Sequence, residues 1–301
     1  MKKNKKRNFI VLGIVIVLVA CITIMLFQVK GEKKEVVETD QNSYRYIKVD
    51  GKDYRYRTNL KTILFLGIDT TDETKNQGQS DAIDLAIFDR DQQKIKIISL
   101  SRDTMCKIRL FDSEGNDLGW DKQHLGLAYS YGKNRKHGGI LAKDAVSKLL
   151  SDVPLVNYTA FDLNSLQELQ DIIGDMPMVL DDDYIDINPL WKKEKKIVIN
   201  RDNVEEFVRS RNTSKDYSNK TRMQRQKLYI QTYINQLKTQ LTNDYSTTLQ
   251  KMYNFYSKLT TNITLKEIDS YAEMILNYSI DNNEYYTLPG EDQKGELHDE
   301  F

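Results

Sequence analysis

The longest apolar segment of the chain runs from Phe9 to Phe27 and contains no charged residue. A helix of this length spans roughly 28 Å, which is about the hydrocarbon thickness of a bilayer. Five basic residues stand before it: Lys2, Lys3, Lys5, Lys6 and Arg7. Because basic residues favour the cytoplasmic side, we expect a single-pass membrane protein. Residues 1–8 are its cytoplasmic tail and residues 9–27 its transmembrane signal-anchor.

A cleaved signal peptide is the alternative interpretation of this segment. The segment is long for a signal peptide, and the Gln28-Val29-Lys30 that follows lacks the small residues of a cleavage site. We therefore favour the uncleaved anchor. Residues 28–43 are rich in charge and are expected to form a stalk, and residues 44–301 are expected to form one extracytoplasmic domain.

Shorter apolar and alternating segments predict the strands of that domain. The alternation of tyrosine with charged residues around Asp50-Gly51 predicts a hairpin of residues 44–49 with residues 52–57. Further strands are expected at Thr62–Gly67, Ala82–Phe88, Lys94–Leu100, Val156–Phe161 and Met176–Leu180. Since only the short turn Asp89–Gln93 joins the second of these to the third, that pair should be antiparallel.

Apolar residues at helical spacing predict the helices. They are expected at Leu125–Tyr131, Ile140–Leu150, Asn164–Ile173 and Arg222–Thr242, with more helix up to Ser279. Asn164 should cap its helix, and Gly174 should follow the end of the same helix. We expect Asp112–Lys122 to be a loop. Strands mixed with helices, one strand pair being antiparallel, predict an α/β (α+β) fold.

Composition narrows the classes of function. The chain has 44 basic and 44 acidic residues, so no excess of positive charge directs it to nucleic acid. One of the two cysteines, Cys21, lies in the apolar segment, so a disulfide framework is excluded. The three histidines show no zinc-binding spacing.

Two aspartates stand at the ends of predicted strands. Asp69 follows the first buried strand, and Asp81 precedes the next. Strand ends at one edge of a sheet are a common place for ligand groups. Two carboxylates there would suit Mg²⁺, which takes its remaining ligands from phosphate oxygens and water. The alternative is that both residues only cap turns.

Arginines are concentrated in the stretch from Arg209 to Gln226. Arg209 and Arg211 share a face if their segment is extended, and Arg222 and Gln226 share a face at a helix start. Arg225 is adjacent to that pair. Guanidinium groups suit phosphate or pyrophosphate, and a helix N-terminus also favours anions. The alternative is a solvated basic surface.

A further arginine, Arg102, follows the third buried strand in the sequence Ser-Arg-Asp. It is a candidate for the same anion site, because two aspartates for a metal and several converging arginines would form a coherent pyrophosphate site. The alternative is a surface ion pair with Asp103 or another carboxylate.

These residues lie in motifs that resemble those of the LytR-CpsA-Psr family of cell-envelope phosphotransferases. The resemblance covers about residues 44–240 and rests on residues 63–69, Gln79-Ser80-Asp81, residues 98–103, Lys122 with residues 128–132, residues 207–211 and residues 222–226. It implies a mixed sheet with helices on both sides that enclose a hydrophobic pocket for a polyprenyl chain. The domain boundaries stay at 44–301, with the core motifs in residues 60–240.

The resemblance also implies a reaction, in which a glycopolymer such as teichoic acid or capsule passes from a polyprenyl-pyrophosphate carrier to peptidoglycan, assisted by Mg²⁺. It implies that Asp69 and Asp81 bind the metal and that Asp81 and Arg102 are catalytic. The implied pyrophosphate ligands are Arg102, Lys122, Arg209, Arg211, Arg222 and Gln226, with Arg225 in support. The expected location is the cell membrane of a Gram-positive-type envelope, with the domain outside.

The chain departs from the family pattern at four positions. Gln79 stands where the family usually has arginine, which removes one positive contact and bears on turnover more than on binding. His124, Asn219 and Asp175 replace the usual asparagine, aspartate and glycine. Gln79 and Asn219 leave one alternative open, an envelope protein that binds lipid pyrophosphate with weakened catalysis. The second alternative is a transcriptional attenuator, which is an older label of the family.

Overall fold

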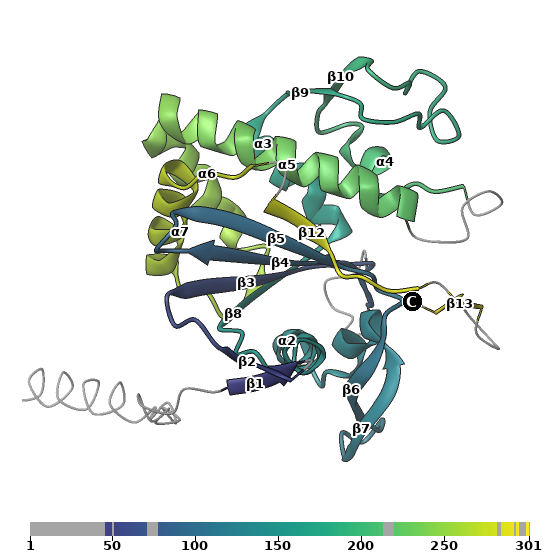
Figure 1. Cartoon of the computed structure of the whole chain (residues 1–301). Coiled ribbons are helices and arrows are strands. Elements are labelled where there is room, and N and C mark those ends of the chain that lie inside the picture. Colours follow the sequence, from purple (N-terminus) through teal and green to yellow (C-terminus); the bar gives the residue numbers. More distant parts are fainter. Residues whose placement is uncertain are drawn as a thin grey trace, which may run out of the picture. The chain divides into compact units, whose positions relative to one another are not determined.

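The computed structural model describes residues 46–49, 51–70, 78–212, 220–281, 284–291, 293–294 and 299–300 (Figure 1). The chain divides into two units, Met1–Tyr56 and Arg57–Phe301. In the first unit, β1 (Tyr46–Val49) and β2 (Lys52–Arg55) form the predicted antiparallel hairpin. Gly51 adopts a φ of +75° in its turn, a conformation that favours glycine.

The predicted anchor at residues 9–27 and the predicted stalk lie outside the described residues. Within the part of the chain that the structure describes, no helix combines the length and apolar character that crossing a bilayer needs.

A six-stranded mixed sheet forms the centre of the second unit, with the strand order β11-β8-β3-β4-β5-β12. Its strands are β3 (Leu60–Ile68), β4 (Ser80–Asp89), β5 (Lys94–Leu100), β8 (Asn157–Asp162), β11 (Thr260–Thr261) and β12 (Tyr285–Thr287). β4 pairs antiparallel with both β3 and β5, as predicted, whereas β8 runs parallel to β3 and β12 runs parallel to β5.

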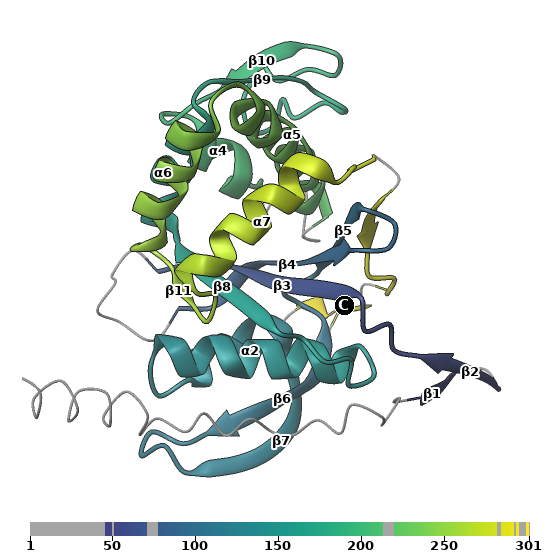
Figure 2. The same cartoon turned by 90° about the vertical axis from the view of Figure 1, so that its left-hand side faces the viewer.

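Helices cover both faces of this sheet (Figures 1 and 2). One face carries the 3₁₀ helix η1 (Leu125–Tyr131), α2 (Arg135–Leu149) and the hairpin of β6 (Met105–Phe111) with β7 (Asp117–His124). The other face carries α3 (Leu166–Ile173), α4 (Val204–Arg209), α5 (Lys220–Asn243), α6 (Tyr245–Tyr256) and α7 (Leu265–Asn277). The remaining elements are η2 (Leu163–Ser165) and the pairs β9 (Met176–Val179) with β10 (Lys196–Ile199) and β13 (Gln293–Lys294) with β14 (Asp299–Glu300).

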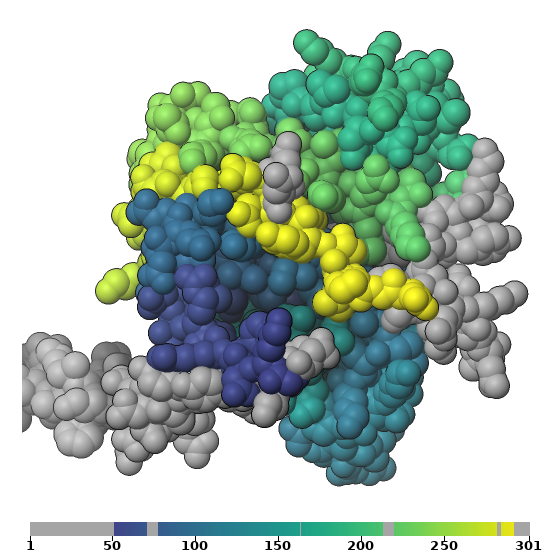
Figure 3. Space-filling model, in the orientation of Figure 1, coloured from purple at the N-terminus to yellow at the C-terminus, as the bar shows by residue number. Residues whose placement is uncertain are grey.

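The alternation of side chains along a strand divides the core in two. Leu64, Leu66 and Ile68 of β3 pack toward α2, whereas Ile63 packs toward α7 on the opposite face. At one edge of the sheet, the yellow C-terminal segment in Figure 3 runs between the blue strands and the green helices. This segment contains β12, which covers the edge of β5.

Two sequence predictions about local structure were wrong. Asp112–Lys122 is not only a loop, because β7 begins at Asp117 and pairs with β6. Most side chains of β7 are exposed, so this strand is held by backbone pairing with β6. It therefore lacks the apolar pattern from which a strand is predicted. The helix predicted at Ile140 begins at Arg135, where the side chain of Asn134 accepts a hydrogen bond from the His137 amide.

A third correction concerns the cap of α3. The helix begins at Leu166, two residues later than expected, after the 3₁₀ turn η2, and the capping position belongs to Ser165 instead of Asn164. Gly174 follows the helix as predicted, with a φ of +71°.

Candidate functional site

Three predicted site residues lie at one edge of the sheet. β3 ends at Ile68, just before Asp69, and β4 begins at Ser80, just before Asp81. Two hydrogen bonds join the ends of the intervening segment: the Asp69 amide donates to the Gln79 carbonyl at 3.0 Å, and the Gln79 amide donates to Asp69 Oδ1 at 2.6 Å. Because β5 runs antiparallel to β4 and ends at Leu100, Arg102 reaches the same edge.

Asp81 lies between two arginines. Arg102 forms an ion pair with Asp81 Oδ1, and Arg222 Nη1 lies 3.3 Å from Asp81 Oδ2. Arg102 also donates to Gln79 Oε1 at 2.7 Å, and its Nε lies 3.5 Å from Asp103 Oδ1. The pair with Asp103 therefore exists, but it is one of several contacts that fix Arg102 in place.

Arg222 is the most enclosed of the arginines at this edge. Only 6 % of its surface is exposed. Burial, followed by repulsion from Arg211 and Arg102, lowers the pKa of Arg222 to about 10. Among the described residues its Nε has no hydrogen-bond partner. A buried guanidinium with an unused donor and cationic neighbours is a site that an anion would stabilise.

Arg209 and Arg211 do not lie on one extended segment, so the condition under which they would share a face is not met. Arg209 ends α4 and forms an ion pair with Glu205, with Nη1 2.6 Å from Oε1. Arg211 follows the helix and is exposed. Repulsion from both arginines contributes to the low pKa of Arg222, which places them near the same site.

Arg225 faces away from the site, into α4. Its side chain is fully buried, donates from Nε to the Phe207 carbonyl at 2.9 Å and also donates to the Ser210 carbonyl. These contacts fix the end of α4, from which Arg209 projects. Gln226 donates to the Val208 carbonyl at 3.0 Å, and it lines the cavity together with Arg222.

Lys122 lies exposed on β7, opposite Lys107 of β6, and it is absent from the lining of the cavity. The β7 residue that approaches the site is His124, whose Nδ1 lies 3.8 Å from Asp103 Oδ1. His124 was noted in the sequence only as a departure from the family pattern.

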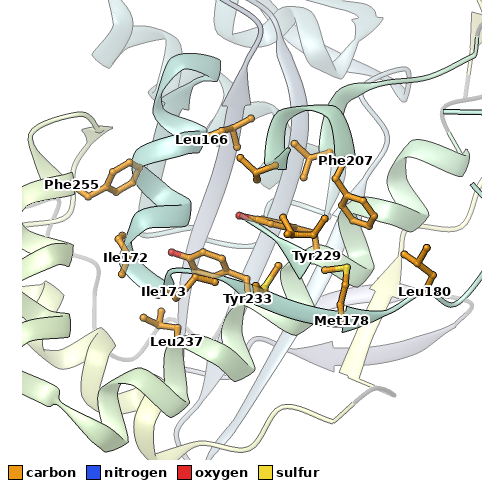
Figure 4. Packing of buried hydrophobic residues seen from close by; sticks show 14 of the residues in the cluster. Leu166, Ile172, Ile173, Met178, Leu180, Phe207, Tyr229, Tyr233, Leu237 and Phe255 are labelled. Carbon is orange, nitrogen blue, oxygen red and sulfur yellow. The ribbon is translucent and has the colours of Figure 1, made fainter. Parts of the chain in front are cut away.

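A cavity of about 310 Å³ extends from this edge between the sheet and the helices. Asp81, Arg209, Arg222 and Gln226 contribute to one part of its wall, and most of the remaining wall is apolar. Figure 4 shows Tyr229, Tyr233 and Leu237 of α5 beside Leu166, Ile172 and Phe255. All six line the cavity.

One face of α5 joins the two parts of the cavity wall. Arg222 and Gln226 lie one turn apart, and Tyr229, Tyr233 and Leu237 continue the same row. The tyrosine hydroxyls bond to α3: Tyr229 donates to Gln170 Oε1 and Tyr233 to the Leu169 carbonyl, each at 2.9 Å. Their rings therefore provide apolar wall. The arrangement suits an amphiphile with an anionic head and a hydrocarbon tail.

The carboxylates at the mouth fit a divalent cation only in part. Within the described ranges, no group of three or more acidic, histidine or cysteine side chains is placed to hold a metal. Asp69 and Asp81 nevertheless offer the oxygen ligands that Mg²⁺ prefers, and Mg²⁺ commonly completes its shell with water and phosphate oxygens. Because arginines pair with Asp81, the fit depends on phosphate from a ligand.

Sequence reasoning missed two buried aspartates of the cavity wall. Asp162 ends β8 and forms an ion pair with Arg135; its place after a predicted strand was the same signal that marked Asp69. Asp84 lies inside β4, and a single polar residue in an apolar strand gave little indication of a role.

Comparison with solved structures supports the same fold. The structure of protein gbs0355 from Streptococcus agalactiae matches with a TM-score of 0.63 and 22% identity, covering 79% of this chain and 80% of that one. TagT bound to LI-WTA matches with a TM-score of 0.59 and 20% identity over 81% and 84% of the two chains. The transcriptional regulator yvhJ from Bacillus subtilis matches with a TM-score of 0.56 and 16% identity over 81% and 90%. At these identities the matches establish the fold alone.

Sequence comparison identifies the family. An uncharacterised protein of Staphylococcus aureus (strain NCTC 8325 / PS 47) is 27% identical over 201 residues, which are 62% of this chain. The match spans 45%, about half, of that relative's length. A sequence model of the LytR_cpsA_psr family matches residues 22–299. That range contains the anion site and the whole lining of the cavity, and the chain therefore belongs to the LytR_cpsA_psr family.

Proposed function

We propose that this protein is a phosphotransferase that moves a glycopolymer from a polyprenyl-pyrophosphate carrier to peptidoglycan. The observation that carries the proposal is the continuous face of α5, which leads from Arg222 and Gln226 to the apolar Tyr229, Tyr233 and Leu237. Membership of the LytR_cpsA_psr family supports cell-envelope glycopolymer transfer in general. TagT, which shares the fold, has been seen with LI-WTA, a wall teichoic acid ligand.

The arginines would bind the pyrophosphate. Arg102 and Arg222 are already held by Asp81, so little reorganisation is needed when phosphate oxygens arrive. Arg209 and Arg211 add positive charge from the end of α4. In the transfer, an acceptor hydroxyl oxygen forms a bond to the phosphorus that carries the glycan. The bond from that phosphorus to the bridging oxygen breaks, the acceptor hydroxyl gives up its proton to the departing phosphate, and the lipid leaves as a monophosphate.

Charge develops on the bridging and peripheral oxygens as that bond breaks. Guanidinium groups fixed at this point stabilise it, and holding the reacting groups in place lowers the entropic barrier. Asp69 and Asp81 are the residues that would hold Mg²⁺, and the bound ion would act as a Lewis acid on phosphate oxygens. The proposed anchor at residues 9–27 would keep the domain beside its lipid substrate.

The test is an assay of the full chain in detergent with a polyprenyl-pyrophosphate glycan, Mg²⁺ and peptidoglycan strands. We expect release of polyprenyl monophosphate and a phosphodiester-linked product. Arg222→Ala should lower turnover by at least about a hundredfold, in the range found when one preorganised donor is removed. Arg201→Ala is the matched control, because Arg201 pairs with Asp171 at an exposed position. Absence of both products from the wild-type protein would overturn the proposal.

A second candidate function is binding of the lipid pyrophosphate with weak or no transfer. The observation that favours it is Gln79, whose neutral amide contacts Arg102 at the site. If the missing charge limits catalysis, Gln79→Arg should raise turnover while changing affinity little. If Gln79 instead serves as the acceptor that orients Arg102, the same substitution should lower turnover, since an arginine cannot accept that hydrogen bond.

A further inference from the structure

A carboxyl group lies within the apolar wall of the cavity. Ala82, Asp84, Ala86 and Phe88 alternate along β4 and all line the cavity. Asp84 is only 8 % exposed. Spaced three residues from Asp81 along the strand, it lies roughly 10 Å from the mouth. The anion site described above has no use for a carboxyl at that depth.

The partners of Asp84 are neutral. Ser99 of β5 donates a hydrogen bond to Asp84 Oδ1, and Tyr285 of β12 donates to the same oxygen at 3.2 Å. The two hydroxyl oxygens lie 2.9 Å apart. Among the described residues, no cation forms an ion pair with Asp84. Its charge is therefore stabilised only by two hydroxyl donors that share one oxygen.

The other ionisable groups around the cavity are accounted for on each element. They are Asp81 on β4, Asp162 on β8, Arg209 on α4, Arg222, Tyr229 and Tyr233 on α5, Tyr256 on α6 and Tyr271 on α7, together with Lys227 of α5, whose Nζ lies 5.3 Å from the Tyr285 ring centroid. Asp81 pairs with arginines and Asp162 with Arg135. None of these charges contributes to the pKa of Asp84, which burial raises to about 6.

A hydrocarbon chain in the cavity would change the surroundings of this carboxyl. The chain would displace water from the Asp84 wall, and an ionised carboxylate without a cation is costly in an apolar environment. The neutral acid avoids most of that cost. Chain binding and protonation of Asp84 must therefore favour each other, because linked equilibria are reciprocal.

We propose that Asp84 is a specificity-determining residue of the cavity: a hydrocarbon chain enters with Asp84 protonated, and the ionised carboxylate disfavours it. The proposal rests on the proposed function, in which the chain is the lipid of the carrier. Its consequence is that chain affinity falls as the pH rises through and above about 6. The inner cavity then favours hydrocarbon at low pH and water at high pH, and this preference does not depend on the arginines at the mouth.

The experiment uses farnesol, a prenyl alcohol without an ionisable head group, so that only the protein titrates. Its dissociation constant is measured with the full chain between pH 5 and pH 8. We expect binding to be at least about tenfold weaker at pH 8 than at pH 5, which corresponds to a pKa raised by one unit on binding. Asp84→Asn should bind farnesol equally at both pH values, as tightly as the wild type at pH 5.

Two further variants sharpen the result. Asp144→Asn is the matched control, because Asp144 is also a carboxyl whose pKa burial raises, but it lies on α2 on the opposite face of the sheet. This variant should keep the wild-type pH dependence. Tyr285→Phe removes one donor to the ionised form, so the loss of affinity should shift to higher pH.

Calorimetry in two buffers of different ionisation enthalpy gives a measurement that needs no variant. If the pKa of Asp84 rises from about 6 to about 7 on binding, wild-type protein should take up roughly half a proton per farnesol bound near pH 6.5. Binding without proton uptake, an equal pH dependence in Asp84→Asn, or no farnesol binding at any pH would each overturn the proposal. Inorganic pyrophosphate binding by the wild type and Arg222→Ala reports separately on the mouth, so failure of the proposed function can be told from failure at Asp84.

Discussion

The contacts of Asp81 show how single residues organise this site. A carboxylate between two guanidinium groups neutralises part of their repulsion and fixes their positions before any ligand binds. Arg222 still has a lowered pKa, first because it is buried and then because Arg211 and Arg102 repel it. The remaining positive charge is what a phosphate group would meet.

Replacing Asp81 by asparagine should destabilise the fold and make stability depend on anions. Two arginines would lose their counter-charge, and we expect the free energy of unfolding to fall by roughly 1–3 kcal/mol. Pyrophosphate should restore part of this loss. Denaturant unfolding followed by the fluorescence of Trp191, which is buried in the core, measures the change.

The control for Asp81 is Asp117→Asn. Asp117 pairs with Arg109 at an exposed position, where a single ion pair contributes less than about 1 kcal/mol. Equal losses in the two variants would contradict the special position of Asp81.

Asp84 makes stability depend on pH in the opposite direction to carboxyl groups whose pKa is lowered in the folded protein, such as Asp117. Its pKa in the folded state, about 6, is above the ordinary value of 3.8. The stability it contributes is therefore fully present below pH 4 and is lost as the pH rises through 6. Two pKa units correspond to about 3 kcal/mol at most. The measurement is the free energy of unfolding of wild type and of Asp84→Asn at pH 4.5 and at pH 8. Between these two pH values the wild type should lose stability relative to Asp84→Asn. An unchanged difference between the two proteins would mean that Asp84 ionises without cost.

At the scale of elements, α5 both lines the cavity and holds the end of α4, and residues for the two roles are interleaved along its sequence. One face provides the cavity wall, while Arg225 on another face donates to the carbonyls of Phe207 and Ser210. Those carbonyls belong to the end of α4, and Arg209 is the last residue of this helix. The geometry of the arginines therefore depends on the packing of the two helices.

Arg225→Met should lower the free energy of unfolding by roughly 2–4 kcal/mol, because buried carbonyl groups lose their partner. Pyrophosphate affinity should fall as well, since the end of α4 is no longer held. Chemical denaturation and calorimetric titration measure the two effects. Asn235→Ala on the exposed side of α5 is the control and should leave both unchanged. A loss of affinity without loss of stability would instead assign Arg225 a direct contact with the ligand.

For the molecule as a whole, the cavity exists because the helices and the sheet do not close on each other completely. Ala82 and Ala86 of β4 leave space where larger residues would fill the layer. Ala86→Leu should occupy part of this space. We expect farnesol affinity to fall about tenfold or more, while inorganic pyrophosphate binding and the melting temperature stay near the wild-type values. Unchanged farnesol affinity would mean that the chain binds elsewhere.

The sequence by itself determined the features that depend on local pattern. Alternating and apolar segments located the central strands, and because these strands pair in order, Asp69, Asp81 and Arg102 followed directly at one edge. Spacing alone put Arg222 and Gln226 on one helix face. The family motifs added the reaction, which stays a proposal.

Only the tertiary structure decided which way the remaining groups face. Arg225 is next to Gln226 in the sequence, but it packs into α4 because it lies 100° around the helix. Lys122 is exposed on a strand whose polar pattern concealed it. The cavity wall and the packed core consist of the same residue types. They differ only in that the wall residues border the space between the sheet and the helices. Burial raises the pKa of Asp84, and burial is a property of the folded protein.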